Sequence, residues 1–184
     1  GFKNSYQHTL KSMDQEGAVL YISSLSKIIS SGLRIGWIIG PQSVIDRLTD
    51  AKQQMDFGQS IFPQSIAKKL LNSQHLSDHI HSLQNGLKIK RDLTIESLEK
   101  EFKGQINAIK PKGGIHLWCQ FSEPVDEQQL FKESLRNGIV FAPGSTLGSS
   151  KNYLRFTYSR VDTNYIQEGI SRFAEAYRKC FKNV

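Results

Sequence analysis

The stretch Tyr21–Gly40, "YISSLSKIISSGLRIGWIIG", decides how this chain is interpreted. Two apolar runs, residues 18–22 and 34–40, each predict a buried strand. Gly32 is expected to allow a tight turn of the backbone before the second strand. Polar side chains of three kinds lie between the apolar runs or at their edges: Ser24, Ser26, Lys27 and Arg34.

These polar side chains suit one kind of ligand. The hydroxyls of Ser24 and Ser26 can donate hydrogen bonds, and the guanidinium of Arg34 is a fork that matches a phosphate. The amine of Lys27 can form an imine with an aldehyde. A phosphorylated aldehyde cofactor would require this combination, whereas an isolated lysine after a strand is usually a solvated surface residue.

Composition sets the limits within which this interpretation must fit. The chain has 184 residues, 38% hydrophobic and 22% charged, with a formal charge of +7 that is scattered rather than clustered. Such a chain is a soluble globular protein of one ordinary or two small domains. No apolar run is long enough to span a membrane, and the first residues do not form a signal peptide. Cys119 and Cys180 lie far apart, which favours free thiols in a reducing cytoplasm.

The remaining periodicity predicts an α/β piece followed by a compact α+β piece. Val44, Leu48, Ala51 and Met55 mark one face of a helix, and a shorter helix is expected after Pro63. A long helix is predicted from an N-cap at Ser77 to Phe102. Short strands are expected after it at residues 105–109, 115–121, 139–144 and 152–159, with helices from Asp126 to Arg136 and from about Asp162 onward.

The stretch "SSLSKIISSGLRIGW" resembles the cofactor-lysine signature of the fold-type I pyridoxal-phosphate enzymes, the class I/II aminotransferases. The pattern is S-x-S-K, a short spacer and then G-L-R-x-G, and the chain departs from it only at Ser31, where many members have proline. The resemblance implies pyridoxal 5′-phosphate as cofactor. It also implies that Lys27 is the Schiff-base lysine and that Ser24, Ser26 and Arg34 bind the cofactor phosphate.

Two later segments are similar to the small domain of the same family. In "PKGGIHLW" a glycine pair that includes Gly114 is implied to let the backbone approach the substrate. In "NYLRFTYS" the family's strand carries the arginine that binds the substrate α-carboxylate, here Arg155. Strand alternation agrees, since Leu154 and Phe156 share the face opposite to Arg155. The alternative is that Arg155 is an exposed arginine in a surface ion pair.

One departure from the family concerns what lies before Lys27. The family's aspartate facing the pyridine nitrogen and its tyrosine facing the ring hydroxyl lie a few dozen residues upstream, and Asp14 and Tyr6 do not fit their spacing. We therefore expect the C-terminal part of a longer protein: residues 1–75 as the end of the large cofactor-binding domain and residues 76–184 as the complete small domain. This part alone is expected to be inactive.

The same module occurs in two classes of protein, and both interpretations stay open. The segment from Gly32 to Ser60 resembles transcription regulators of the MocR type somewhat more closely. In those, a winged-helix GntR-like domain precedes an aminotransferase-like domain. This implies an amino acid or related amine as effector, a homodimer of the intact protein, DNA binding through an N-terminal domain outside this chain, and a cytoplasmic location. The alternative is a free-standing aminotransferase.

Two other motifs in the chain suggest different chemistry. Ser24 to Lys27 also fits the S-x-x-K signature of serine acylases, but the nearest later motifs, Ser150-Lys151-Asn152 and Lys112-Gly113-Gly114, stand in reversed order. His75, His79 and His81 lack a cysteine or carboxylate that would complete a metal site, so solvated helix histidines and no metal are expected.

Overall fold

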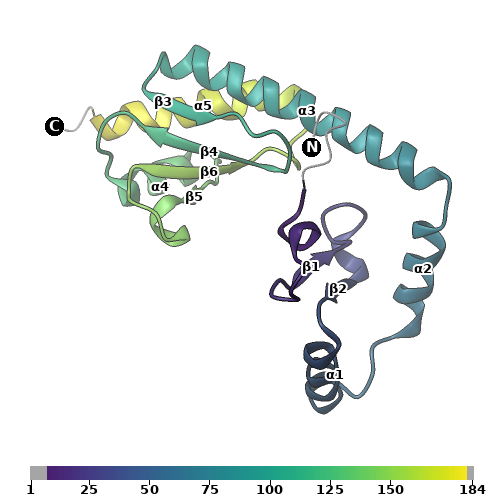
Figure 1. Ribbon diagram of the computed structural model, residues 1–184. Helices are drawn as coiled ribbons and strands as arrows, with labels where there is room; N and C mark the ends of the chain where they lie inside the picture. Colours follow the sequence, from purple (N-terminus) through teal and green to yellow (C-terminus); the bar gives the residue numbers. More distant parts are fainter. Residues whose placement is uncertain (1–7, 182–184) are drawn as a thin grey trace. The chain divides into compact units, whose positions relative to one another are not determined.

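The computed structural model describes residues 8–181 and divides them into two compact units, residues 8–83 and 84–181 (Figure 1). The boundary at 83/84 lies inside the long helix α3 (His75–Phe102), eight residues after the boundary at 75/76 that the sequence predicts. Tyr6 lies outside the described residues.

The first unit is built on a two-stranded antiparallel sheet. Strand β1 (Tyr21–Ser24) pairs with β2 (Gly36–Ile39) so that Tyr21 lies opposite Ile39 and Ser24 opposite Gly36. The predicted helices follow as α1 (Gln42–Met55) and α2 (Ile61–Leu71), and then α3 begins. The short 3-10 helices η1 (Leu10–Met13) and η2 (Ser31–Leu33) complete the unit.

The first strand differs from the prediction in both position and burial. It begins at Tyr21 rather than residue 18, because the carboxylate of Asp14 accepts hydrogen bonds from the amides of Ala18 at 3.0 Å and Val19 at 3.1 Å. A hydrogen bond from Lys11 together with these amides holds the pKa of Asp14 well below its usual range. The strand is not buried either, since Ile22 is 71% exposed.

The start of α3 also differs from the prediction. The helix begins at His75, whose amide donates to the hydroxyl of Ser73 at 3.1 Å, so Ser77 lies inside the helix and is not its N-cap. A serine two residues before the first helical residue meets the orphan amide equally well, and the apolar spacing alone does not distinguish the two serines.

The second unit is a two-layer structure of one sheet and three helices. The antiparallel sheet has the order β3-β4-β6-β5, and α3, α4 and α5 supply the helical layer. The bounds of the remaining elements are β3 (Ile106–Ile109), β4 (His116–Phe121), α4 (Glu127–Arg136), β5 (Ala142–Pro143), η3 (Gly144–Leu147), β6 (Tyr153–Thr157) and α5 (Thr163–Phe181).

Sequence patterns predicted most of these elements. The helix predicted from Asp126 to Arg136 is confirmed as α4, and the carboxylate of Asp126 caps it by accepting from the amides of Gln128 and Gln129. The strand predicted over residues 139–144 is limited to Ala142–Pro143, because the amide of Ile139 bonds to the carbonyl of Ser134 and Gly144 opens η3.

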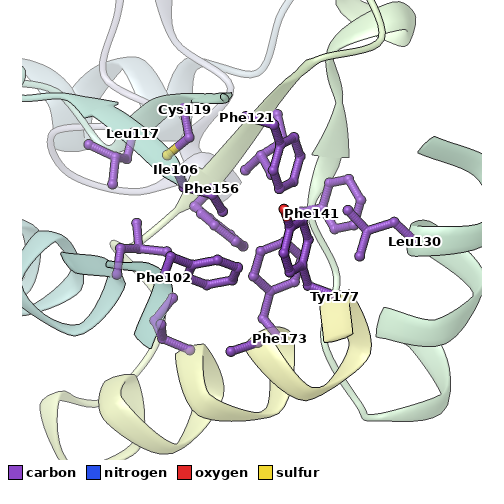
Figure 2. Close-up of a cluster of buried hydrophobic side chains, with 14 of the residues drawn as sticks. Phe102, Ile106, Leu117, Cys119, Phe121, Leu130, Phe141, Phe156, Phe173 and Tyr177 are labelled. Atoms are coloured by element: carbon purple, nitrogen blue, oxygen red, sulfur yellow. The ribbon is translucent and has the colours of Figure 1, made fainter. Parts of the chain in front are cut away.

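The hydrophobic core belongs to the second unit (Figure 2). Phe173 of α5 is fully buried, and its ring lies 5.0 Å from that of Phe156, 5.5 Å from Phe141 and 5.6 Å from Phe102. Among the described residues of the first unit, only Leu25 and Ala67 are hydrophobic and buried. The apolar faces of β4, β6 and α5 therefore build a core, whereas the β1–β2 pair does not.

Candidate functional site

The first candidate region is the connection between β1 and β2, residues 24–34, called here the lysine loop. Its base continues the ladder, since the amide of Leu25 donates to the carbonyl of Ile35 at 3.0 Å. The chain then makes a single turn in which the amides of Ile28, Ile29 and Ser30 all approach the carbonyl of Leu25. Leu25 is only 2% exposed and anchors the loop, while Lys27 is exposed within the turn.

The register of the two strands brings the predicted phosphate-binding residues to one end of the sheet. Ser24 lies opposite Gly36 in this register, and Arg34 precedes Gly36 by two residues, so Ser24 and Arg34 lie at the same end of the strand pair. Within the described residues, the hydroxyls of Ser24 and Ser26 and the amine of Lys27 form no hydrogen bond or ion pair. One guanidinium nitrogen of Arg34 donates to the carbonyl of Ser31 at 3.2 Å, and its other donors point to no described acceptor. The loop thus presents several unused donors.

The unusual backbone conformation in the lysine loop belongs to Arg34. Its φ of 52° and ψ of 35° are left-handed, which costs a residue with a side chain about 1–2 kcal/mol. Gly32 lies in a tight turn before β2, as predicted, because it is part of the 3-10 helix η2; it has no positive φ, and its amide donates to the hydroxyl of Ser30. Strained residues of this kind are frequent at binding and catalytic sites.

A residue that sequence reasoning assigned to solvent contacts this loop. The Nε2 of His79 on α3 lies 2.8 Å from the carbonyl oxygen of Ile28, the residue next to Lys27. The two residues are 51 positions apart, so no spacing in the sequence could have indicated the contact. The described residues contain no cluster of histidine, cysteine or carboxylate side chains that could hold a metal ion.

The second candidate region is the sheet face opposite the core, called here the arginine face: His116, Trp118, Tyr153, Arg155 and Thr157. Arg155 lies opposite Trp118 in the β4–β6 register, and the rings of Trp118 and Tyr153 stack at 5.6 Å. The imidazole of His116 and the hydroxyl of Thr157 are 2.9 Å apart.

Arg155 is half-buried on this face and is not engaged in an ion pair with any described residue. Its Nε is buried and lacks a hydrogen-bond partner in the part of the chain that the structure describes. Arg155 also lines a cavity of about 430 Å³, whose other walls include Phe141, Val161 and Ile166. A buried guanidinium donor without a partner costs free energy. The alternative of a surface ion pair finds no support here.

Gly114 precedes the arginine face in a loop that is fixed by several contacts. Its φ of +91° suits glycine alone, and its carbonyl accepts a hydrogen bond of 2.7 Å from the hydroxyl of the buried Tyr158. Arg91 of α3 donates to the carbonyl of Pro111 at 2.8 Å in the same loop.

Arg91 is itself held by the neighbouring carboxylate of Asp92, which also meets Lys88 and Lys110. Burial alone would raise the pKa of Asp92, but the hydrogen bonds from these three cations outweigh it and lower the pKa. Sequence reasoning missed the contacts that Arg91 and Tyr158 make with the loop before the arginine face, because both side chains donate to backbone carbonyls there.

The strand pair with its lysine loop and the four-stranded antiparallel sheet define an aminotransferase-like protein. Residues 2–173 match the family described as aminotransferase class I and II, and the chain belongs to that family. The match confirms the predicted aminotransferase fold, an α/β piece followed by an α+β small domain. Pyridoxal 5′-phosphate is the cofactor of this family. The family match also excludes the serine acylase interpretation of Ser24 to Lys27.

Similar proteins include both regulators and enzymes. The uncharacterized HTH-type transcriptional regulator YdfD of Bacillus subtilis (strain 168) is 38% identical over 89% of this chain and 34% of its own length. Aromatic-amino-acid aminotransferase 1 of Thermococcus litoralis is 32% identical over 94% of the chain and 42% of its own. The crystal structure of Pyrococcus horikoshii kynurenine aminotransferase in complex with PMP superposes with a TM-score of 0.90 at 29% identity, covering 97% of this chain and 45% of that one.

The chain therefore spans roughly a third to two-fifths of the length of the curated relatives that it matches. Among the helices of residues 8–181, none combines the length and the apolar character that crossing a membrane requires.

Proposed function

We propose that this chain is the cofactor- and effector-binding part of a transcription regulator of the MocR type. In this proposal the lysine loop binds pyridoxal phosphate and Arg155 binds the carboxylate of an amino acid or a related amine. A separate GntR-like domain of the intact, homodimeric and cytoplasmic protein binds DNA.

The observation that carries the proposal is the set of unused donors on the lysine loop. The hydroxyls of Ser24 and Ser26, the exposed amine of Lys27 and the guanidinium of Arg34 lie in one connection between two paired strands. A phosphate ester is matched by hydroxyl and guanidinium donors, and an aldehyde by an amine. The donor set therefore fits the cofactor of the family.

Each residue has a distinct task in the proposed site. Ser24, Ser26 and Arg34 hold the phosphate, and Lys27 holds the cofactor covalently through its amine. When bound, pyridoxal phosphate supplies a conjugated ring that can accept electron density from the amine carbon of a ligand.

In the second unit, Arg155 supplies a buried Nε–H without a described partner for a carboxylate. Gly114 supplies a backbone that can approach the ligand closely, because nothing lies within 4 Å of the position where a Cβ would be.

The cofactor assignment can be tested in the full-length protein. We expect pyridoxal phosphate to add a visible absorbance band and, after borohydride reduction, a label on the peptide that contains Lys27. Lys27→Ala should abolish both, whereas Lys68→Ala, which changes an exposed lysine of α2, should leave them intact. A label that persists in Lys27→Ala would refute the assignment.

Arg34→Ala tests the phosphate site separately. Removing a charge-assisted hydrogen bond of roughly 1.5–3 kcal/mol should weaken cofactor binding about tenfold or more. A cofactor affinity equal to that of the unaltered protein would instead make Arg34 a structural residue.

The regulator is supported by the likeness to YdfD, the more similar of the two curated relatives described above. The test is the affinity of the full-length protein for its own promoter DNA with and without amino acids, at fixed salt, since phosphate contacts make DNA binding salt-dependent. The proposal expects an amino acid to change that affinity and Arg155→Ala to remove the change.

The second candidate function is a free-standing aminotransferase of amino acids. It is favoured by the likeness to aromatic-amino-acid aminotransferase 1 and to the solved kynurenine aminotransferase. Conversion of amino acid to keto acid without DNA binding at any salt concentration would make this candidate correct.

A further inference from the structure

We propose that His79 is a positioning residue that fixes the lysine loop, and so sets where the amine of Lys27 stands. The inference rests on the proposed function, in which Lys27 holds the cofactor. The inference gives α3 a role in positioning the lysine loop, and the family pattern around Lys27 contains no residue of that helix.

The geometry of the loop explains why one more contact matters. The turn that contains Lys27 is held at its start by Leu25, whose side chain is 2% exposed and whose carbonyl receives the amides of residues 28–30. Lys27 itself is exposed and forms no hydrogen bond within the described residues. On the far side of Lys27, the carbonyl of Ile28 meets the imidazole of His79 at 2.8 Å. Lys27 thus lies between the buried side chain of Leu25 and the contact of Ile28 with His79.

The chemistry of the contact assigns the proton on the imidazole. A backbone carbonyl can only accept a hydrogen bond, so the Nε2 of His79 must carry the hydrogen. The imidazole is therefore the donor in this contact and the carbonyl of Ile28 is the acceptor.

The contact can position a reacting group even though it contributes little to stability. A hydrogen bond between exposed groups adds about 1 kcal/mol at most. The same bond adds a contact to α3 to a loop that is otherwise held by its own backbone hydrogen bonds, and an amine that must meet an aldehyde gains from being held in place beforehand. We therefore expect loss of this contact to slow the attachment of the cofactor and to make local opening of the loop more frequent.

Two variants and one matched control separate positioning from folding. His79→Ala removes the donor, and His79→Gln retains an N–H near the place of Nε2. His75→Ala is the control, because His75 lies one turn earlier on the same side of α3 and its imidazole has no hydrogen bond within the described residues. Circular dichroism melting should show all three to be folded, since His75 and His79 are both exposed.

The first readout is amide hydrogen exchange of the peptide covering residues 25–30 in the cofactor-free, full-length protein. Losing about 1 kcal/mol corresponds to roughly fivefold faster exchange for His79→Ala, with His79→Gln and His75→Ala within about twofold of the unaltered protein. Equal exchange in His79→Ala and His75→Ala would overturn the inference.

The second readout is the rate at which pyridoxal phosphate becomes fixed to the protein by borohydride. We expect His79→Ala to slow it several-fold and His79→Gln to restore it. Failure of His79→Gln to restore either readout would also overturn the inference. Borohydride labelling that survives Lys27→Ala would overturn the proposed function and this inference together, whereas loss of labelling in Lys27→Ala with no effect of His79→Ala would overturn the inference alone.

Discussion

Phe173→Ala should destabilise the second unit selectively. The ring is fully buried and touches three other aromatic rings, those of Phe102, Phe141 and Phe156. Truncating a fully buried phenylalanine costs about 3–5 kcal/mol, because the apolar contacts are lost and a cavity remains. The upper part of that range is expected here, since edge-to-face ring pairs add about 0.5–1.5 kcal/mol each beyond the buried area. A domain of this size is stable by about 5–15 kcal/mol in total.

The distribution of tryptophan makes the assay specific. The chain has two tryptophans, Trp37 in β2 of the first unit and Trp118 in β4 of the second. In a Trp37→Phe background, urea unfolding followed by fluorescence therefore reports on the second unit. Phe57→Ala is the control, because Phe57 is fully exposed in the first unit and should change the free energy of unfolding by less than about 0.5 kcal/mol.

The outcome that refutes the reasoning is a small effect. If Phe173→Ala lowered the free energy of unfolding by less than about 1 kcal/mol, the aromatic cluster would not be the main source of stability of the second unit. The same conclusion would follow if Phe57→Ala and Phe173→Ala were equally damaging.

The remaining predictions concern single positions. Gly144→Ala should destabilise the protein by about 1–3 kcal/mol in thermal melts, because a Cβ there would lie 2.6 Å from the carbonyl oxygen of Tyr153. Gly86→Ala, in an open position on α3, should instead stabilise it by about 0.5–1 kcal/mol, and a loss would count against the helix at that position. Burial raises the pKa of the Cys119 thiol to about 12 from 9.0, so its contribution to stability is complete below pH 9 and is lost between pH 9 and 12. Iodoacetamide at pH 8 should accordingly leave Cys119 unmodified until urea unfolds the second unit; rapid modification of the folded protein would contradict its burial.

Patterns with a fixed period were predicted well. The alternation of Leu154 and Phe156 is buried as expected, because one face of a strand must leave water when it has a partner layer. The first unit shows the limit of the same reasoning. The apolar runs on either side of the lysine loop predicted buried strands, but Ile22 is exposed, since apolar character does not say which layer will cover it.

Contacts made by backbone groups could not be predicted. The carboxylate of Asp14 accepts hydrogen bonds from two backbone amides, and His79 and Tyr158 each contact a backbone carbonyl. Because every residue carries the same backbone groups, the sequence does not indicate which of them a side chain will meet. The motif around Lys27 indicates which side chains fit a cofactor. It does not indicate the contact between this loop and His79 of α3, which lies 51 positions from Ile28.

At Arg34 the requirements of stability and of the proposed cofactor binding oppose each other, because a left-handed backbone favours glycine and phosphate binding requires a guanidinium. Glycine adopts this conformation without steric penalty, so Arg34→Gly would relieve a cost of about 1–2 kcal/mol and leave the fold more stable. The same change would remove the only guanidinium of the lysine loop. A library of this chain selected for thermal stability alone should therefore accumulate glycine at residue 34, and one selected for cofactor retention should keep arginine despite its backbone.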